Sequence, residues 1–226
     1  MIIPKYTPSE LRRNMRYILL DPKSWLILFN QFIINMGDWK KIESSVKDDY
    51  SVLRNDRLGI TFYSNLNYGR IIISEWEIWN KFYRFPFSLL GKTVLDVGAG
   101  CGESALFFSL CKAEKVICIE KNLDLIRFIE ENRKTNSLNW DIINEPFNLS
   151  HLKLKFDAIK MDIEGCESEL LNLVNIPSPM VLEVHSQLLF KEFSRRGFKT
   201  SKVIDSKNRI VLMNNFFRGS YLNGEN

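Results

Sequence analysis

The chain has 226 residues, of which 45% are hydrophobic and 26% are charged, so it suits one globular α/β domain with a modest extension and excludes disordered and fibrous classes. The excess behind its formal net charge of +4 is N-terminal: residues 1–90 hold 13 Lys and Arg against 9 Asp and Glu, whereas residues 91–226 hold 18 of each kind. Such an excess fits an anionic partner such as nucleic acid or lipid headgroups, but it is more often an ordinary solvated surface.

The features that report on compartment favour a cytoplasmic protein. The four cysteines form no C-x-x-C pair and three lie in apolar stretches, which predicts a reduced setting. The N-terminus lacks the pattern of a signal peptide, and residues 25–36, the most apolar early stretch, are too short to span a bilayer. Residues 11–19 carry apolar residues on one helical face and arginines on the other, so peripheral membrane contact is an alternative to a helix packed on the domain.

The N-terminal segment is predicted to begin with two helices, at about 9–20 and 23–36, separated by Asp21-Pro22. Residues 51–64 and 67–74 are rich in β-branched and aromatic side chains, which predicts short strands, and a helix is expected near 75–84. Residues 1–85 are therefore predicted to form a cap of helices and a small β element that selects the substrate.

From Lys92 onward, predicted strands and helices alternate. The expected elements are 93–97, 103–110, 115–120, 123–136, 140–144, 158–162, 166–173, 180–185, 187–196, 198–204 and 209–214. This alternation predicts a mostly parallel sheet with helices on both faces, and the last two strands predict an antiparallel hairpin. An α/β, Rossmann-like sheet that ends in this way is typical of class I methyltransferases, so we assign that domain to residues 86–215 and a tail to 216–226.

A glycine-rich turn follows the first strand of that domain. Its pattern is D-x-G-x-G-x-G, with Asp96 two residues before Gly98, whereas a dinucleotide fingerprint would need a glycine where Glu103 stands. A carboxylate in the first turn of the following helix also disfavours a phosphate there. These features favour S-adenosyl-L-methionine (SAM), which has no phosphate, with Asp96 orienting its methionyl ammonium.

Acidic residues also lie at or just after the ends of the next two predicted strands. Glu120 can accept hydrogen bonds from both ribose hydroxyls, and Glu145 is expected near the adenine edge. The residues predicted to hold SAM are Asp96, Gly98, Ala99, Gly100, Gly102, Glu120, Lys121, Glu145 and Asp162.

Residues 156–167 resemble the "K-x-D-x-E-G-x-E" block of the FkbM family of SAM-dependent methyltransferases. Residues 94–104 are similar to the family's first motif, although Cys101-Gly102 replaces the more usual Asn-x-Gly. Residues 182–185 resemble its "E-x-H" strand and residues 196–198 its late "G-F/Y" turn. The resemblance covers about 65–214 and implies methyl transfer, mostly O-methylation of polyketides and sugars, without identifying the acceptor.

The catalytic candidates are Asp162, Glu164 and His185. Methyl transfer from a sulfonium is an in-line displacement, so the protein must position the acceptor and remove its proton, which a carboxylate or an imidazole can do. We expect no metal ion; the alternative is a divalent cation held by Asp162, Glu183 and His185. We interpret Glu167 as an acid that complements the dipole of a helix start.

Two absent motifs bear on the acceptor. The sequence has no N-P-P-[FY] motif, used by amino-directed methyltransferases, and no Pro-Cys nucleophile, used by C5-pyrimidine enzymes. We therefore predict a hydroxyl on a small molecule or glycan as the acceptor. The alternatives are an RNA methyltransferase and a non-catalytic SAM-binding interaction module, and the oligomeric state is open.

Overall fold

The computed structural model describes residues 39–85, 87–163, 167–177, 179–203 and 210–214. The predicted helices at 9–20 and 23–36, the tail from 216 and Glu164 lie outside these residues. In the part of the chain that is described, no helix is long and apolar enough to cross a membrane.

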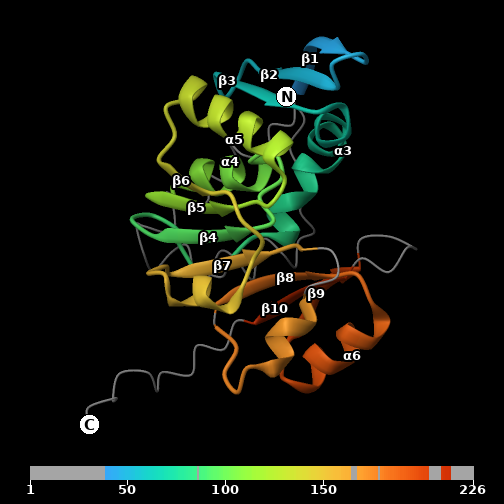
Figure 1. Ribbon diagram of the computed structural model, residues 1–226, viewed down its shortest axis with the longest axis vertical. Coiled ribbons are helices and arrows are strands. Elements are labelled where there is room, and N and C mark those ends of the chain that lie inside the picture. Colours follow the sequence, from blue (N-terminus) through green and yellow to red (C-terminus); the bar gives the residue numbers. More distant parts are fainter. Residues whose placement is uncertain (1–38, 86, 164–166, 178, 204–209, 215–226) are drawn as a thin grey trace, which may run out of the picture.

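The main sheet has seven strands (Figure 1). In spatial order they are β6 (Trp140–Ile143), β5 (Lys115–Ile119), β4 (Thr93–Val97), β7 (Ala158–Met161), β8 (Met180–Val184), β10 (Ile210–Asn214) and β9 (Lys199–Val203). The first five strands are parallel, and β10 is antiparallel to both of its neighbours. The predicted parallel sheet with a terminal antiparallel hairpin is therefore confirmed.

The central strands are apolar on both sides because helices cover both faces. One core joins side chains of β4, β5 and β7 to α3 (Leu66–Phe82), α4 (Glu103–Leu110) and α5 (Leu123–Thr135). The second core joins the alternate side chains of those strands to α6 (Gln187–Arg195) and the 3-10 helix η2 (Glu167–Asn172). A further 3-10 helix, η1 (Leu149–Lys153), precedes β7. The site lies where α4 and α5 begin, after β4 and β5.

Residues 39–64 form a three-stranded antiparallel sheet, which α3 follows. Its strands are β1 (Trp39–Ser45), β2 (Tyr50–Asn55) and β3 (Ile60–Ser64), in that spatial order. The strand predicted at 67–74 is wrong, because α3 already begins at Leu66. Asn65 caps this helix by accepting a hydrogen bond from the Tyr68 amide, and Ile72 and Trp76 lie four residues apart in the core. Tertiary packing thus overrides the β-branched run at 71–73.

Two asparagines of α5 join the three-stranded sheet to the main domain. The Asn132 side chain exchanges two hydrogen bonds with the backbone of Tyr63, both 2.7 Å long. Asn136 does the same with Thr61, at 3.1 and 2.8 Å. Residues two apart on a strand and four apart on a helix have similar spacing, so the two amides satisfy the edge of β3 as a neighbouring strand would.

Candidate functional site

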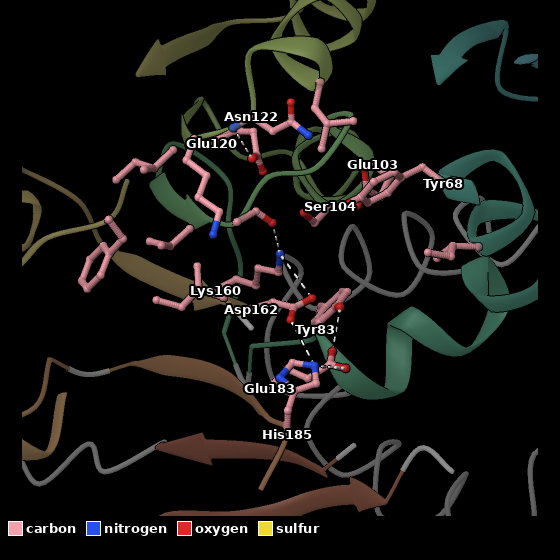
Figure 2. A pocket seen from close by; sticks show the side chains of 18 of the residues that line it. Tyr68, Tyr83, Glu103, Ser104, Glu120, Asn122, Lys160, Asp162, Glu183 and His185 are labelled. Carbon is pink, nitrogen blue, oxygen red and sulfur yellow. Dashed lines mark hydrogen bonds and ion pairs between the residues drawn. The ribbon is translucent and has the colours of Figure 1, made fainter. Parts of the chain in front are cut away.

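A cavity of about 390 Å³ lies at the carboxyl ends of β4, β5, β7 and β8, beside the point where the strand order reverses (Figure 2). Ligands of open parallel sheets bind at this place. Helix α3 contributes one wall, which includes Tyr68 and Trp79. The polar residues of the whole wall are Asn67, Tyr68, Glu75, Tyr83, Glu103, Ser104, Glu120, Lys121, Asn122, Glu145, Lys160, Asp162, Glu183 and His185.

The residues predicted to hold SAM divide into two groups. Those that line the cavity are Gly98, Glu120, Lys121, Glu145 and Asp162. Those that are buried and not among the lining residues are Asp96, Ala99, Gly100 and Gly102. The second group therefore supports the turn without lining the cavity.

The glycines of the turn are required by the packing of the protein itself. Gly98, Gly100 and Gly102 all have positive φ, of 74°, 59° and 89°. A Cβ at Gly98 would overlap the Asp162 carbonyl oxygen, and a Cβ at Gly102 would lie 2.8 Å from the Trp140 ring. Close approach to neighbouring elements therefore accounts for these glycines, in addition to any approach to a ligand.

The backbone amides of residues 98–102 all have acceptors within the protein. Gly98 and Ala99 donate to Ile119 O at 2.9 and 3.1 Å, Gly100 to Glu120 Oε2 at 3.0 Å, Cys101 to Glu103 Oε2 at 2.9 Å and Gly102 to Ala99 O at 2.7 Å. Two of these acceptors are carboxylates in the cavity wall. The turn thus has no amide left for a phosphate and presents acids where a phosphate would sit.

Two of these wall acids differ in their environment. Glu120 accepts from Gly100 and, through its other oxygen, from the Asn122 amide at 2.8 Å, which fixes its carboxylate at the end of β5. Glu103 is buried in the first turn of α4, and burial raises its pKa to about 8. Further along the wall, Glu145 lies 2.6 Å from His151 Nε2.

Asp96 pairs with a lysine from the neighbouring strand. Lys160 Nζ lies 3.2 Å from Asp96 Oδ1 and donates to the Gly98 carbonyl at 2.8 Å, while Ser104 donates to Asp96 Oδ2 at 2.7 Å. Burial raises the pKa of Asp96 and lowers that of Lys160, but the surrounding carboxylates, Asp96 first, outweigh burial and leave the Lys160 pKa above its ordinary value. The lysine therefore remains an ammonium.

A group of acids surrounds His185 where β7 and β8 end (Figure 2). His185 Nε2 lies 3.7 Å from Asp162 Oδ1 and 3.6 Å from Glu183 Oε1, and its Nδ1 lies 2.8 Å from Glu167 Oε1. Candidate ligand atoms of Asp162, Glu183 and His185 lie within 4.8 Å of one another. The structure thus brings together the three residues of the alternative metal set. We call Asp162, Glu183, His185 and Glu167 the acid–histidine cluster.

The cluster raises the pKa values of two residues, His185 and Asp162. The hydrogen bond to Glu167, followed by the interaction with Glu183, raises the pKa of His185 to about 10. Burial, followed by the negative charge of Glu183, raises the pKa of Asp162 to about 6. At neutral pH the cluster therefore favours an imidazolium and a carboxylate.

Among the residues of the site for which no ligand or catalytic role was predicted, three make contacts that shape its charge. Lys160 is the one charged residue of β7, Glu167 bonds to His185 besides starting η2, and Tyr83 donates to Glu183 Oε2 at 3.4 Å. The interpretation of Glu167 as a helix-dipole acid alone was incomplete. A lysine within an apolar central strand was a signal in the sequence, because burying it requires a partner.

Comparisons with known proteins bear on the fold. No protein-family model matches the chain. An uncharacterized protein, 158B, of Sulfolobus islandicus rod-shaped virus 1 is 33% identical over 99 residues, and the match covers 41% of this chain and 60% of that protein. The chain therefore spans less than two thirds of that relative. The resemblance to the FkbM family stays a prediction.

Solved structures show the same architecture. PH0793 of Pyrococcus horikoshii has a TM-score of 0.52 and 18% identity, covering 74% of this chain and 71% of that one. TYW2 of the same organism, solved in complex with MeSAdo, has a TM-score of 0.51 and 19% identity, covering 78% of this chain and 74% of that one. The chain has the Rossmann-like methyltransferase fold, as predicted from its sequence.

Proposed function

We propose that this protein is a SAM-dependent methyltransferase that methylates a hydroxyl of a small molecule or glycan. The observation that carries the proposal is a single cavity that joins the glycine turn and Glu120 to the acid–histidine cluster. The cavity therefore places the proposed cofactor-binding residues beside side chains that can accept or donate a proton.

The residues of the turn fit SAM better than a phosphate-bearing cofactor. With every amide of residues 98–102 engaged, a pyrophosphate would gain no donor from this turn and would face the Glu120 carboxylate. SAM carries no phosphate and adds a sulfonium and an ammonium, which suit an acid-rich wall. The Glu120 carboxylate retains acceptor capacity for ribose hydroxyls, because each of its oxygens has two lone pairs.

Bound SAM would supply an electrophilic methyl group, and the protein would orient the acceptor and remove its proton. We assign the proton acceptor to Asp162, since a carboxylate with a pKa of about 6 is largely ionised at neutral pH. His185, with a pKa of about 10, is already protonated and suits a different role: its imidazolium holds Asp162 in place and stabilises negative charge on the acceptor oxygen. Glu164 stays a candidate from sequence alone.

Calorimetry tests the cofactor directly. We expect SAM and S-adenosylhomocysteine to bind the wild-type protein, and NAD and ATP not to bind. Binding of NAD in preference to SAM would contradict the proposal. Incubating a cell extract with radiolabelled SAM and the protein, then testing the labelled product for base-stable methyl ether, identifies the acceptor class. A labelled product that is an N- or C-methyl compound would overturn the hydroxyl assignment.

The RNA alternative has less support in the described residues. The three-stranded sheet, residues 39–64, holds five Lys and Arg against four Asp and Glu, and Lys40 and Arg54 both pair with Asp56. An excess of one cation is small for a phosphate-binding surface, which gains its affinity from several lysines and arginines. Filter binding to total RNA over a salt series tests this alternative, which predicts affinity that falls steeply as salt rises.

We predict turnover without a metal ion. The Nδ1 contact with Glu167 favours the imidazolium form of His185, which has no lone pair for a cation. Activity in the presence of EDTA should equal activity in its absence. Loss of activity in EDTA, restored by Mg²⁺ or Mn²⁺, would instead support a cation held by Asp162, Glu183 and His185.

A further inference from the structure

Lys160 is a buried charge at the floor of the cavity. It lies in the central strand β7, opposite Asp96 of β4 in the parallel register, and its side chain is 2% exposed. Its strand neighbours Ile159 and Met161 are apolar and buried. Burying an ammonium destabilises the folded protein unless partners compensate its charge. A lysine at this position therefore calls for a role.

The ammonium of Lys160 makes one hydrogen bond in the described part of the chain, to the Gly98 carbonyl at 2.8 Å. Its contacts with Asp96 Oδ1 at 3.2 Å and Asp162 Oδ2 at 4.0 Å are ion pairs. Because an ammonium has three donors, Lys160 keeps donor capacity for a group in the cavity, which it lines.

Asp96 cannot take the role predicted for it from sequence while this arrangement holds. Its side chain is fully buried, and its two oxygens face Lys160 and Ser104, which line the cavity in front of it. At this point of the wall a ligand therefore meets a cation, in the place where the sequence predicted an anion. A cation attracts the carboxylate of an amino acid and repels its ammonium.

We propose that Lys160 anchors the carboxylate of the methionyl part of SAM, and that Asp96 holds Lys160 instead of the methionyl ammonium. The inference rests on the proposed cofactor and is independent of the methyl acceptor. The Gly98 carbonyl and the charge of Asp96 hold the lysine, so its ammonium is already ordered before a ligand binds. Asp162 and Glu183 make another side of the cavity acidic, and this side suits the positively charged groups of the cofactor.

SAM and decarboxylated SAM differ only in the carboxylate, so the ratio of their affinities measures this contact. Calorimetry would compare SAM with decarboxylated SAM on the wild-type protein and on a D96N/K160M variant. Changing both residues avoids leaving a buried carboxylate without its cation, and methionine keeps the length of the lysine stem. We expect the wild type to prefer SAM by about 10- to 100-fold, the size of a charged hydrogen bond, and the double variant to bind both ligands equally.

Single variants sharpen the result. K160R keeps a cation and should retain a preference for SAM. K121M removes the other lysine of the cavity wall, which is itself predicted to hold SAM, so it tests the competing anchor: the affinity for both ligands can fall, but their ratio should still favour SAM. K134M, at an exposed lysine of α5 outside the wall, is the neutral control. If K121M abolishes the preference instead, the anchor is Lys121 and the proposal for Lys160 is wrong.

The remaining outcomes are also decisive. A wild type that binds both ligands equally has no carboxylate anchor, and this result needs no variant to fold. A D96N/K160M variant that weakens both ligands by the same factor would show that Lys160 only supports the glycine turn, which overturns the proposal. If the wild type binds neither ligand nor S-adenosylhomocysteine, the proposed cofactor itself fails, and the anchor fails with it.

Discussion

At one end of the cavity, the turn of residues 98–102 has every backbone amide bonded inside the protein, whereas at the other end the acid–histidine cluster is built from side-chain charges. The turn is recognisable from three glycines spaced two residues apart, a local feature of the sequence that permits its positive φ angles and close packing. The cluster depends on residues that directly follow β7, begin η2 and end or follow β8, and these residues meet only in the folded chain. Changes at the first end should therefore act on binding, and changes at the second on turnover.

The largest effect is expected from D162N, which keeps the size of the side chain and removes its basicity. We expect kcat to fall by about 10²- to 10⁴-fold, the range typical of a lost general base, while the affinity for S-adenosylhomocysteine changes by less than about threefold. D141N, at an exposed aspartate paired with Lys115, is the matched control and should retain activity. An unchanged kcat in D162N would remove the catalytic assignment and favour a binding module.

A smaller effect, on affinity, is expected from E120A. The variant removes the acceptor of the Gly100 and Asn122 amides and the proposed partner of the ribose hydroxyls. We expect SAM to bind about 10- to 100-fold more weakly, measured by calorimetry. E130A, an exposed acid on α5, serves as the control. Equal affinity of E120A and wild type would contradict the proposed seat of the cofactor.

The pH dependence separates the two titrating groups of the cluster. Asp162 must be ionised to accept a proton, so kcat/KM should rise about tenfold per pH unit below a pKa of about 6. It should fall again above a pKa of about 10, where His185 loses its charge. In E167Q the upper limb should move to lower pH, because the first cause of the raised His185 pKa is gone. An upper limb that stays in place would show that another group titrates there.

The same shift has a consequence for stability. The folded protein holds the His185 proton more tightly than the unfolded chain, whose histidine pKa is about 6.5. This stabilisation is complete below pH about 6.5 and is lost as the pH rises toward about 10. The difference in unfolding free energy between wild type and E167Q should therefore shrink over that interval.

The smallest effect on activity is expected from the asparagines that join β3 to α5, because their loss acts on stability. N132A leaves the Tyr63 backbone and the Cys101 carbonyl without partners at a buried position, which should cost about 2–3 kcal/mol of unfolding free energy. N136A breaks a similar pair at a half-buried position, where water can replace the amide, and should cost about 1 kcal/mol. Urea unfolding measures both. Equal losses would show that burial does not distinguish the two sites.

The sheet and the cofactor end of the site could be predicted from sequence because their signals are local. The apolar runs at 94–97 and 116–119 and the spacing of the three glycines indicate strands and a turn without knowledge of the fold. The strand predicted at 67–74 failed because the Ile71–Ile73 run favours β structure, whereas tertiary packing buries only Ile72 of the three, on the same face of α3 as Trp76. Local preference is weak where packing decides.

The missed contacts share long separations in sequence. Lys160 and Asp96 are paired across neighbouring strands, and Glu167 reaches His185 from a different element. No periodicity links such residues, so the sequence could indicate that a buried lysine needs a partner without naming it. The side chains whose roles could not be predicted from sequence are those that determine the distribution of charge in the cavity.

The amide of Asn132 donates to both the Tyr63 carbonyl and the Cys101 carbonyl, at 2.7 and 2.9 Å. A single side chain thus ties the edge of the three-stranded sheet to the turn beneath the cavity. A ligand that reduces the motion of that turn should also reduce the motion of β3. Amide hydrogen exchange in residues 60–64 should therefore slow when a ligand occupies the cavity. The segment before residue 85 would then report on occupancy at a site formed largely by residues that follow it.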